Sequence, residues 1–394
     1  MEYRNRKNTN CVKWDGLKKE FGEEDLLAMW VADMDFACPD CVTEALKQYM
    51  NAPLGYFIPP ESYFETVVRW EREHHNYEIE PEWICVTPGV VPAIYWAVRV
   101  FTKPEDSVMV SPPVYYPFMH AVEHCEQRKL IKCELKRTGQ TYEIDFDRFE
   151  EDIVKHNVKL YILCNPHNPI GRVWKREELK RLLDLCRKHH VMVISDEIHQ
   201  DIINPKLGRE KVTAAAVGDY DDMLITMAAA SKTFNIAAVQ NSFVIIPDKA
   251  NREKFKQFME NLSLGSGNAF GYIAAEAALR GGEAWLEDVI DVIYGNYEYI
   301  RERFKAECPE VKISNLEGTY LMWLDFSAFF DTEEELKEFL QRTCKIAMDY
   351  GSWFGAEGYD AFARMNIATS RENVERACDS MICALRERQK AMQQ

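Results

Sequence analysis

Lys232 is the residue in this sequence whose type and setting most directly suggest covalent chemistry. It follows the short apolar run at 223–227, so we expect it in a loop at the carboxyl end of a buried strand, where open α/β sheets carry their catalytic groups. Ser231 and Thr233 flank it, and Phe234 follows. Partial desolvation beside apolar residues would lower the pKa of the amine toward the nucleophilic form that makes Schiff bases. The alternative is an ordinary surface lysine in a polar turn.

Loops after two other predicted strands could hold a flat, phosphorylated ligand. Gly89 opens a helix and leaves the backbone N–H groups of Val90 and Val91 without helical partners, and such a helix start binds phosphate. The proline-stiffened loop at 111–118 presents Tyr115, whose ring could stack on a flat cofactor. Each feature has a plain structural alternative, since glycine opens many strand-to-helix turns and aromatic rings often fill the space between helix and sheet.

Polar side chains follow two more predicted strands. The stretch at 164–171 contains two Asn-Pro pairs, which favour turns, and the amide of Asn168 could donate to a phenolate oxygen. In the stretch at 195–201, Asp196 lies at the mouth of an apolar strand, where a carboxylate is unfavourable unless a cationic or protonated group pairs with it. His199 could face the same cleft. The alternatives are a purely structural double turn for the stretch at 164–171, a helix N-cap for Asp196 and a structural histidine for His199.

The elements that would position these groups follow an α/β pattern. Continuous apolar strands that alternate with helices imply a mostly parallel sheet covered on both faces. After Pro309 the pattern changes to a smaller α+β unit, and Ser62 is a fair N-cap for a helix that ends near His75. The strands predicted for the larger sheet lie at 84–87, 107–110, 158–164, 191–195, 223–227 and 242–246. The later unit is predicted to have strands at 312–314, 320–326 and 362–368 and helices at 332–343 and 371–390.

Taken together, the loops offer a phosphate cradle, an aromatic platform, a donor for a phenolate, a carboxylate for a ring nitrogen and a lysine for an aldehyde. Each of these complements one part of pyridoxal 5′-phosphate (PLP). The chain resembles the fold-type I PLP enzymes of the aminotransferase class I/II superfamily over nearly its whole length. Within them it is similar to the MalY/PatB branch of cystathionine β-lyase type carbon–sulfur (C–S) lyases, through MWVADMDF at 29–36, TPGVV at 87–91, SDEIH at 195–199 and SKTFNI at 231–236.

The resemblance implies roles for the residues of these loops. Lys232 would bind the cofactor aldehyde as a Schiff base, and Asp196 would pair with the pyridinium nitrogen. Asn168 and His199 would contact the ring oxygen, while Tyr115 would stack on the ring and count among the catalytic residues. Val90 and Val91 would form the phosphate cradle, and Ser231 would be a further cofactor-binding residue.

It also implies a substrate clamp, a homodimer and a domain division. Arg364 matches the family arginine that holds the substrate α-carboxylate, a task suited to its planar fork. Tyr56 would reach the phosphate of the partner's cofactor. The implied fold is a large PLP-binding domain at 51–285 with a mostly parallel seven-stranded sheet, a smaller α+β C-terminal domain at 286–394, and an N-terminal arm at 1–50 that contributes to the small domain.

The activity implied by the resemblance is α,β-elimination from an L-amino acid that carries sulfur on Cβ, such as L-cystathionine or another S-substituted L-cysteine, giving a thiol, pyruvate and ammonia. Lys232 would be the general base. Gln240 stands where many aminotransferases carry a phosphate-binding arginine, which favours the lyase branch over an aminotransferase. An aminotransferase remains the main alternative, and a regulatory binding protein on the same fold is a further one. Asp33 and Asp35 could border the substrate pocket or be solvated turn carboxylates.

The composition excludes several classes of partner. The 394 residues carry a formal net charge of −16, which argues against nucleic acid or an anionic membrane as the main partner. The 12 cysteines form no dense framework, so we expect them to be reduced, and the C-x-x-C at 38–41 lacks a second pair at zinc-site spacing, so no metal is predicted. With neither a bilayer-spanning apolar run nor a signal-peptide core, we expect a cytoplasmic protein.

Overall fold

The computed structural model describes residues 1–125, 127–208, 211–265 and 267–392. Its central feature is a seven-stranded sheet in the order β2-β10-β9-β8-β7-β3-β4, in which only β10 runs antiparallel to its neighbours. The strands are β2 (Ile84–Thr87), β3 (Ser107–Val110), β4 (Lys129–Lys132), β7 (Val158–Cys164), β8 (Met192–Asp196), β9 (Leu224–Ala228) and β10 (Ser242–Ile245). The predicted fold, α/β with a mostly parallel seven-stranded sheet, is therefore confirmed.

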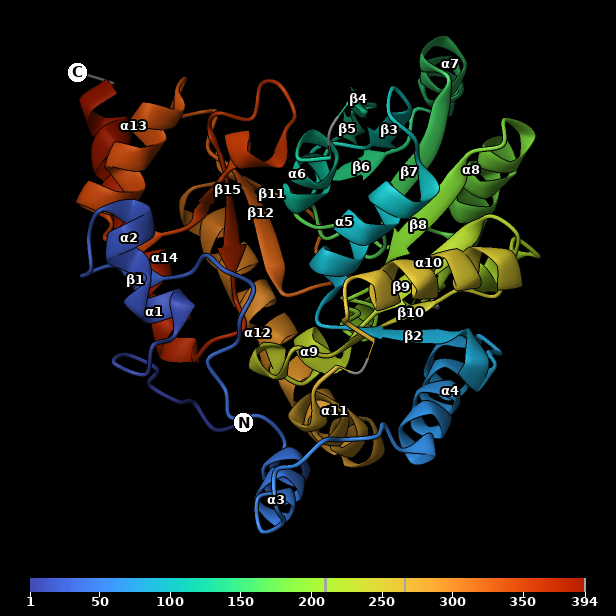
Figure 1. Ribbon diagram of the computed structural model, residues 1–394. Helices are drawn as coiled ribbons and strands as arrows, with labels where there is room; N and C mark the ends of the chain where they lie inside the picture. Colours follow the sequence, from blue (N-terminus) through green and yellow to red (C-terminus); the bar gives the residue numbers. More distant parts are fainter. Residues whose placement is uncertain (126, 209–210, 266, 393–394) are drawn as a thin grey trace.

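Helices cover both faces of this sheet (Figure 1). On β7, Leu160 and Ile162 pack with α5 (Val90–Phe101), α6 (Pro117–Glu123) and α10 (Lys249–Asn261). The alternate residues Tyr161 and Leu163 pack with α7 (Phe146–His156) and α8 (Arg176–Lys188) on the other face. A strand whose side chains are buried on both faces must be apolar throughout, which is why these strands read as continuous apolar runs in the sequence.

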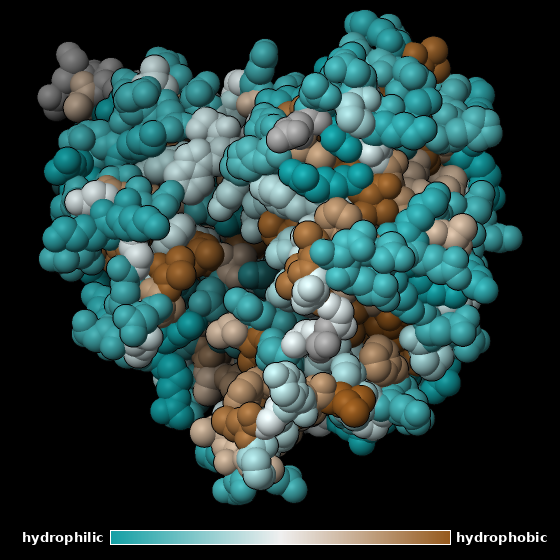
Figure 2. Space-filling model, in the orientation of Figure 1, coloured by the Kyte–Doolittle hydropathy of each residue, from teal (hydrophilic) through white to brown (hydrophobic). Residues whose placement is uncertain are grey.

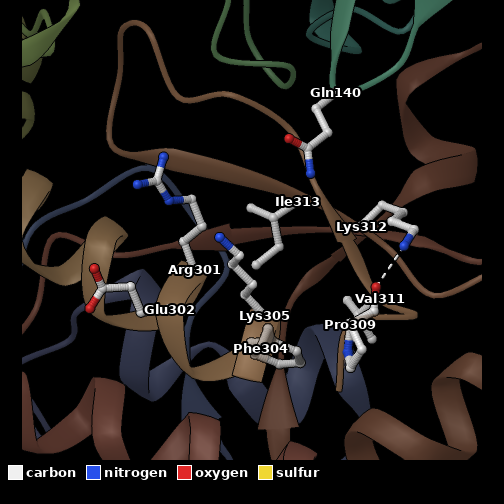
Figure 3. A pocket seen from close by; sticks show the side chains of 9 residues that line it. All are labelled: Gln140, Arg301, Glu302, Phe304, Lys305, Pro309, Val311, Lys312 and Ile313. Carbon is white, nitrogen blue, oxygen red and sulfur yellow. Dashed lines mark hydrogen bonds between the residues drawn. The ribbon is translucent and has the colours of Figure 1, made fainter. Parts of the chain in front are cut away.

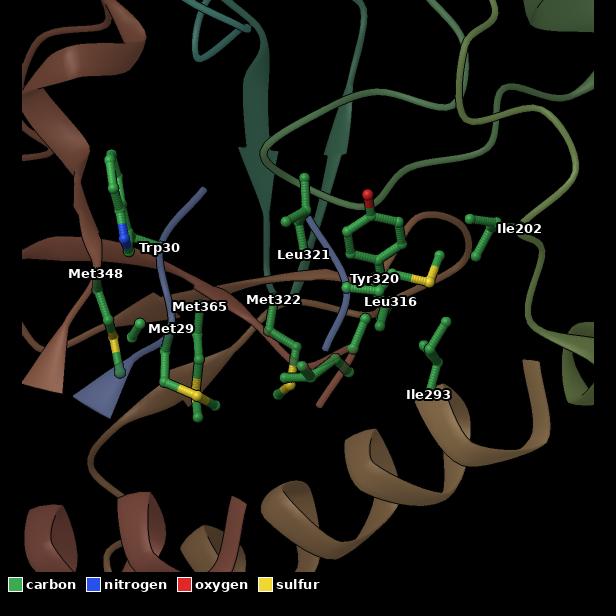
Figure 4. Packing of buried hydrophobic residues seen from close by; sticks show 14 of the residues in the cluster. Met29, Trp30, Ile202, Ile293, Leu316, Tyr320, Leu321, Met322, Met348 and Met365 are labelled. Carbon is green, nitrogen blue, oxygen red and sulfur yellow. The ribbon is translucent and has the colours of Figure 1, made fainter. Parts of the chain in front are cut away.

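A second, four-stranded antiparallel sheet has the order β11-β12-β15-β14. Its strands are β11 (Lys312–Ile313), β12 (Leu321–Asp325), β14 (Asp349–Tyr350) and β15 (Phe362–Asn366). It packs through a methionine-rich apolar cluster against α12 (Glu283–Glu307) and α14 (Arg371–Met392) (Figure 4). This unit carries Arg364, so the substrate clamp predicted from the sequence comes from a different sheet than Lys232.

The N-terminal segment crosses to this second unit, where β1 (Leu27–Ala28) pairs in parallel with β13 (Ile346–Ala347). The chain then returns to the large sheet and places residues 29–36 beside the loops that follow its strands. The N-terminal part of the chain also forms α1 (Val12–Asp15), α2 (Leu17–Phe21), α3 (Asp40–Tyr49) and α4 (Glu61–His75), and α3 and α4 pack against α11 (Ala269–Gly281). The remaining ones are β5 (Lys136–Thr138), β6 (Thr141–Glu143), α9 (Ala230–Thr233), α13 (Glu333–Lys337), a π-helical turn at Glu338–Thr343, and 3₁₀ turns at Pro81–Trp83, Pro205–Leu207, Ala214–Val217, Ala237–Val239 and Gly351–Phe354.

Several local predictions were wrong. Lys232 lies in the one-turn helix α9 and not in a loop. The helix that ends at His75 begins after Pro60, which has no capping side chain, so Ser62 lies inside its first turn. The helix predicted at 332–343 is the short α13 followed by the π-helical turn. Within the described part of the chain, no helix combines the length and the apolar character needed to cross a lipid bilayer.

Candidate active site

The loops after β2, β3, β7, β8 and β9 meet at one cavity of about 190 Å³. It lies at the carboxyl ends of the parallel strands, as expected for an open α/β sheet. In Figure 2 the surface is hollowed between α5 and the side of the molecule that carries β12 and β15. The sequence-predicted residues that line the cavity are Val90, Val91, Tyr115, Asn168, Asp196, His199, Ser231 and Lys232.

Lys232 is half-buried and lines this cavity. Its Nζ donates a hydrogen bond of 2.6 Å to the carbonyl oxygen of Ala32. Burial lowers the pKa of the amine, although the nearby carboxylate of Asp33 acts in the opposite direction. The amine is therefore easier to deprotonate than that of a surface lysine, which is what a Schiff-base lysine and a general base require.

Asp196 lies at the end of β8 and is 4% exposed. One carboxylate oxygen accepts a hydrogen bond of 3.0 Å from the backbone N–H of Ile198. Burial raises the pKa of this carboxyl to about 7, and the charge of Lys232 offsets only part of that effect. Among the described residues, no cationic side chain forms an ion pair with it. A cationic or protonated group of a ligand in the cavity would be a suitable partner for this carboxyl.

Asn168 links the cavity to Arg364. Its Oδ1 accepts a hydrogen bond of 2.9 Å from Nη1 of Arg364, and both side chains are buried. Nη2 of the same arginine donates to Asp349. Arg364 does not itself line the cavity, but its charge contributes to the lowered pKa of His199 and Lys232, so it lies close behind the cavity wall.

His199 is 4% exposed and lines the cavity. Burial, with added repulsion from Lys232 and Arg364, holds its pKa well below the ordinary value, so the ring is neutral. Its Nδ1 is buried and has no hydrogen-bond partner among the described residues. The ring meets Tyr320 edge to face, with centroids 5.6 Å apart. A ligand oxygen in the cavity would satisfy this nitrogen.

The predicted phosphate cradle and aromatic platform border the same space. Val90 and Val91 occupy the first turn of α5, where backbone N–H groups have no helical acceptor. Tyr115 packs against Tyr116 and Phe118, with ring centroids 5.3 Å and 6.0 Å away, and lines the cavity. Tyr115 is thus a packed aromatic and also a wall of the cavity, and its stacking on a cofactor ring stays a prediction.

Tyr56 does not line the cavity, and in the single chain its side chain is fully exposed. It lies in the segment between α3 and α4 together with other exposed apolar residues, Met50, Leu54 and Ile58. Its role toward a partner's cofactor therefore stays a prediction.

Asp33 and Asp35 differ from the solvated turn carboxylates considered for them. Asp35 is fully buried and forms an ion pair of 2.7 Å with the buried Lys13, with a further hydrogen bond from Trp14. Asp33 pairs with Arg6 at 2.6 Å. The two carboxylates fasten the N-terminal arm beside the cavity wall formed by Ala32.

Sequence reasoning missed three contributors to the site. The carbonyl of Ala32 accepts hydrogen bonds from Lys232 and, at 3.1 Å, from the hydroxyl of Tyr320. Asp349 binds Arg364. Ala32 lies within the motif at 29–36, which could have directed attention to it. No sequence signal marks Asp349, because strand pairing alone brings it to Arg364.

A larger hollow of about 530 Å³ lies elsewhere, between α12 and β11 (Figure 3). Arg301, Lys305 and Lys312 stand around it, and Lys312 donates to the backbone oxygen of Pro309. Its lining provides positive charge but no buried carboxylate or histidine beside a lysine. The smaller cavity at the sheet edge is therefore the candidate active site.

Comparison with known proteins agrees with this assignment. The family model "aminotransferase class I and II" matches residues 24–381. The chain belongs to this family. It is 41% identical to cystathionine β-lyase PatB of Bacillus subtilis, over 93% of this chain and 94% of the relative.

Solved structures of similar proteins contain the cofactor that the site suggests. Cystalysin from Treponema denticola, with PLP, has a TM-score of 0.94 and 37% identity and covers 98% of both chains. The PLP-bound C–S lyase from Staphylococcus hominis has a TM-score of 0.90 and 30% identity, over 98% of this chain and 97% of that one. The family resemblance inferred from the sequence motifs is confirmed.

Proposed function

We propose that this chain is a PLP-dependent C–S β-lyase that cleaves L-cystathionine or a related S-substituted L-cysteine. The observation that carries the proposal is the meeting of Lys232, Asp196 and His199 in one cavity, with Arg364 held just behind it by Asn168. The similarity to PatB, cystalysin and the C–S lyase supports both the cofactor and the reaction class. The name of PatB, a cystathionine β-lyase, supports L-cystathionine as the substrate.

The cavity fits the cofactor through the polar groups that line it. Asp196 would pair with the protonated ring nitrogen. The buried, unpartnered Nδ1 of His199 and the amide of Asn168 would face the ring oxygen. Ser231 and the backbone N–H groups at the start of α5 would hold the phosphate, Tyr115 would cover the ring, and Lys232 would bind the aldehyde.

PLP supplies the electron sink for the carbanion at the substrate Cα. Side chains of the protein would orient the substrate, keep the ring nitrogen protonated and transfer the proton. Arg364 orients the substrate by its carboxylate, and Asp196 in its ionised form keeps the ring nitrogen protonated. Lys232, with its amine free, would remove the Cα proton as general base. The carbonyl of Ala32 then accepts from the resulting ammonium, as it does from Lys232 in the structure.

The lowered pKa of Lys232 also suits the second half of the reaction. An ammonium with a depressed pKa gives up its proton readily, so Lys232 can return a proton to the sulfur that leaves Cβ. Overall, one substrate molecule and one water molecule would yield a thiol, pyruvate and ammonia. With L-cystathionine the thiol would be homocysteine.

We also propose that the chain acts as a cytoplasmic homodimer in which Tyr56 reaches the partner's active site. Support comes from the exposed apolar segment that carries Met50, Leu54, Tyr56 and Ile58. Figure 2 shows apolar surface at the same end of the molecule, around α3 and α11. The resemblance to the MalY/PatB enzymes also supports a division into a large domain at 51–285, a small one at 286–394 and an arm at 1–50.

Incubation of the PLP-loaded protein with L-cystathionine, with and without 2-oxoglutarate, tests the reaction class. A β-lyase forms pyruvate and ammonia at the same rate in both mixtures, because it needs no amino acceptor. An aminotransferase turns over only when 2-oxoglutarate is present and converts it to glutamate. Turnover that depends strictly on the keto acid would therefore overturn the lyase proposal in favour of transamination.

A further inference from the structure

The guanidinium of Arg364 already has an anionic partner within the protein. Arg364 on β15 lies opposite Asp349 on β14 in antiparallel register, so the two side chains share a face of the sheet. Nη2 donates to the Asp349 carboxylate, and each side chain is 2% exposed. Met348, which precedes Asp349, and Met365, which follows Arg364, belong to the apolar cluster of this unit (Figure 4).

Arg364 has an unused donor as well. Nη1 donates to Asn168, but Nε is buried and lacks a hydrogen-bond partner among the described residues. Leaving a buried donor unsatisfied is unfavourable, so this edge of the guanidinium suits an incoming acceptor. A substrate carboxylate that binds there would share one guanidinium with Asp349.

Two ionised carboxylates on one buried guanidinium repel each other. In a site shielded from water, such a pair lowers its free energy when one carboxyl takes up a proton. Asp349 is the better acceptor, because burial raises its pKa despite the charge of Arg364, whereas the α-carboxylate of an amino acid is the stronger acid.

The other groups that face Asp349 do not relieve this conflict. Glu20 of α2 is an exposed carboxylate whose charge raises the pKa of Asp349 further. The charge of Asp349 also acts on the hydroxyls of Tyr115, Tyr116 and Tyr350. Burial raises the pKa of these hydroxyls, so they stay neutral. Arg364 is thus the one cation among the charged groups that act on Asp349 in the described structure.

We propose that Asp349 couples substrate binding to proton uptake: a carboxylate that binds at Arg364 does so with the uptake of one proton by the Asp349 carboxyl. The inference rests on the proposed role of Arg364 as the carboxylate clamp. It makes Asp349 a positioning residue, which acts on the substrate only through Arg364. Asn168 keeps the guanidinium oriented when Asp349 becomes neutral.

The sign of the pH dependence follows from this linkage. A ligand carboxylate that raises the pKa of Asp349 binds most tightly at low pH, where Asp349 can be protonated. Its affinity falls by up to about tenfold per pH unit between the pKa of Asp349 in the free protein and that in the complex, and is level outside this window. Asp349→Asn imitates the protonated carboxyl, since its amide oxygen can still accept from Nη2, and removes the pH dependence.

Propionate is a suitable probe, because it carries a carboxylate but has no amine to react with the cofactor. Its binding to the PLP-loaded protein is measured by titration calorimetry from pH 5.5 to 8.5, in buffers of different ionisation enthalpy that report proton uptake. We expect uptake of up to one proton in the wild type and none in Asp349→Asn, which binds about tenfold more tightly at pH 8. Glu20→Gln, the matched loss of a nearby exposed carboxylate, should still take up a proton when propionate binds, because it keeps the Asp349 carboxyl, although the pH window should move slightly lower.

Proton uptake that is unchanged by Asp349→Asn, or binding of propionate that does not vary with pH in the wild type, would overturn the proposal. If propionate gives no measurable heat, the KM for L-cystathionine over the same pH range decides the question, with kcat as the internal control. Arg364→Lys distinguishes an error in the proposed carboxylate clamp from an error in the proposed proton coupling. If it leaves propionate binding and KM unchanged, the clamp itself is wrong; if it weakens both while Asp349→Asn has no effect, only the coupling is wrong.

Discussion

At the scale of single residues, the cavity contains buried polar groups whose partners are missing from the protein. Asp196 has a backbone N–H on one oxygen and no counter-ion among the described residues. His199 has an unpartnered Nδ1. Buried polar groups are normally satisfied, so such exceptions indicate a ligand site. The neutral ring of His199 and the raised pKa of Asp196 both follow from burial without a partner.

The first prediction concerns Asp196 in the cofactor-free protein. Its pKa is about 7 in the folded state and has the ordinary value of 3.8 when unfolded. A carboxyl with a raised folded pKa contributes stability at low pH that is lost as the pH rises from about 4 to 7. Asp196→Asn cannot ionise, so its free energy of unfolding relative to wild type should rise by roughly 2–3 kcal/mol between pH 5 and pH 8.

Urea unfolding of both cofactor-free proteins at the two pH values measures this difference. Because other buried groups titrate equally in the two proteins, the comparison isolates Asp196. A difference that does not change with pH would show that Asp196 keeps an ordinary pKa. In the PLP-loaded enzyme the same substitution should lower kcat/KM by about 10²–10⁴-fold, since it removes the charge that keeps the ring nitrogen protonated.

At the scale of elements, a buried network holds the short helix α9, which carries Lys232, against α4. Thr233 donates to Asp201 at 2.6 Å, and Asp201 also bonds His75 at 2.8 Å and Trp70 at 3.2 Å. Burial alone would raise the pKa of Asp201, but His75, Lys211 and Thr233 together hold it well below its usual value. A helix of one turn has little stability of its own, so this network fixes the place of Lys232.

The second prediction follows from this network. Asp201→Ala leaves buried donors on Thr233, Trp70 and His75 without their acceptor, and should lower the free energy of unfolding by about 3 kcal/mol. Glu298→Ala, which breaks the more exposed pair with Lys206, should cost less than about 1 kcal/mol. Urea unfolding at neutral pH measures both. Equal effects of the two substitutions would contradict the role assigned to the buried network.

The elements themselves were largely predictable. Strands buried on both faces must be apolar throughout, which made the runs that became β7, β8 and β9 visible in the sequence. The edge strand β4 was missed, because its ends are exposed lysines and its apolar core is only Leu130 and Ile131. The carboxyl ends of parallel strands share one edge of a sheet, so the sequence could predict that the loops with Lys232 and Asp196 lie together. The pairing of β14 with β15, and with it the contact of Asp349 with Arg364, depends on register that no local pattern encodes.

At the scale of the whole molecule, the site is assembled from two sheets and the N-terminal segment. Lys232 comes from the large sheet, Arg364 from the small one and the carbonyl of Ala32 from the segment after β1. The segment between α3 and α4 stands apart from this assembly. Its exposed apolar side chains contribute nothing to the cavity, and no pattern within one chain can show what covers them.

The third prediction tests the proposed dimer through this segment. Ile58 is 87% exposed, so Ile58→Asp should leave the fold of a single chain intact. It should shift a homodimer toward monomers in sedimentation velocity, because a charge in an apolar interface is unfavourable. Val154→Asp, at another exposed apolar position on α7, is the matched control and should leave the mass unchanged. A wild-type protein that sediments as a monomer would contradict the dimer.

Tyr56→Ala addresses the contribution across the interface. If Tyr56 reaches the partner's phosphate site, this variant should bind PLP more weakly while it keeps the wild-type mass. Retention of the cofactor during dialysis, followed by its absorbance, measures the effect. Unchanged retention in a dimeric Tyr56→Ala protein would remove Tyr56 from the site.

The most direct test of the central claim is to follow pyruvate and free thiol together when L-cystathionine is added to the PLP-loaded protein. The proposed function predicts that both appear catalytically and in equal amounts, and that Lys232→Ala abolishes both. If neither product appears while the cofactor remains bound through Lys232, the β-lyase assignment fails for this substrate. Pyruvate without a matching amount of thiol would contradict cleavage of the C–S bond.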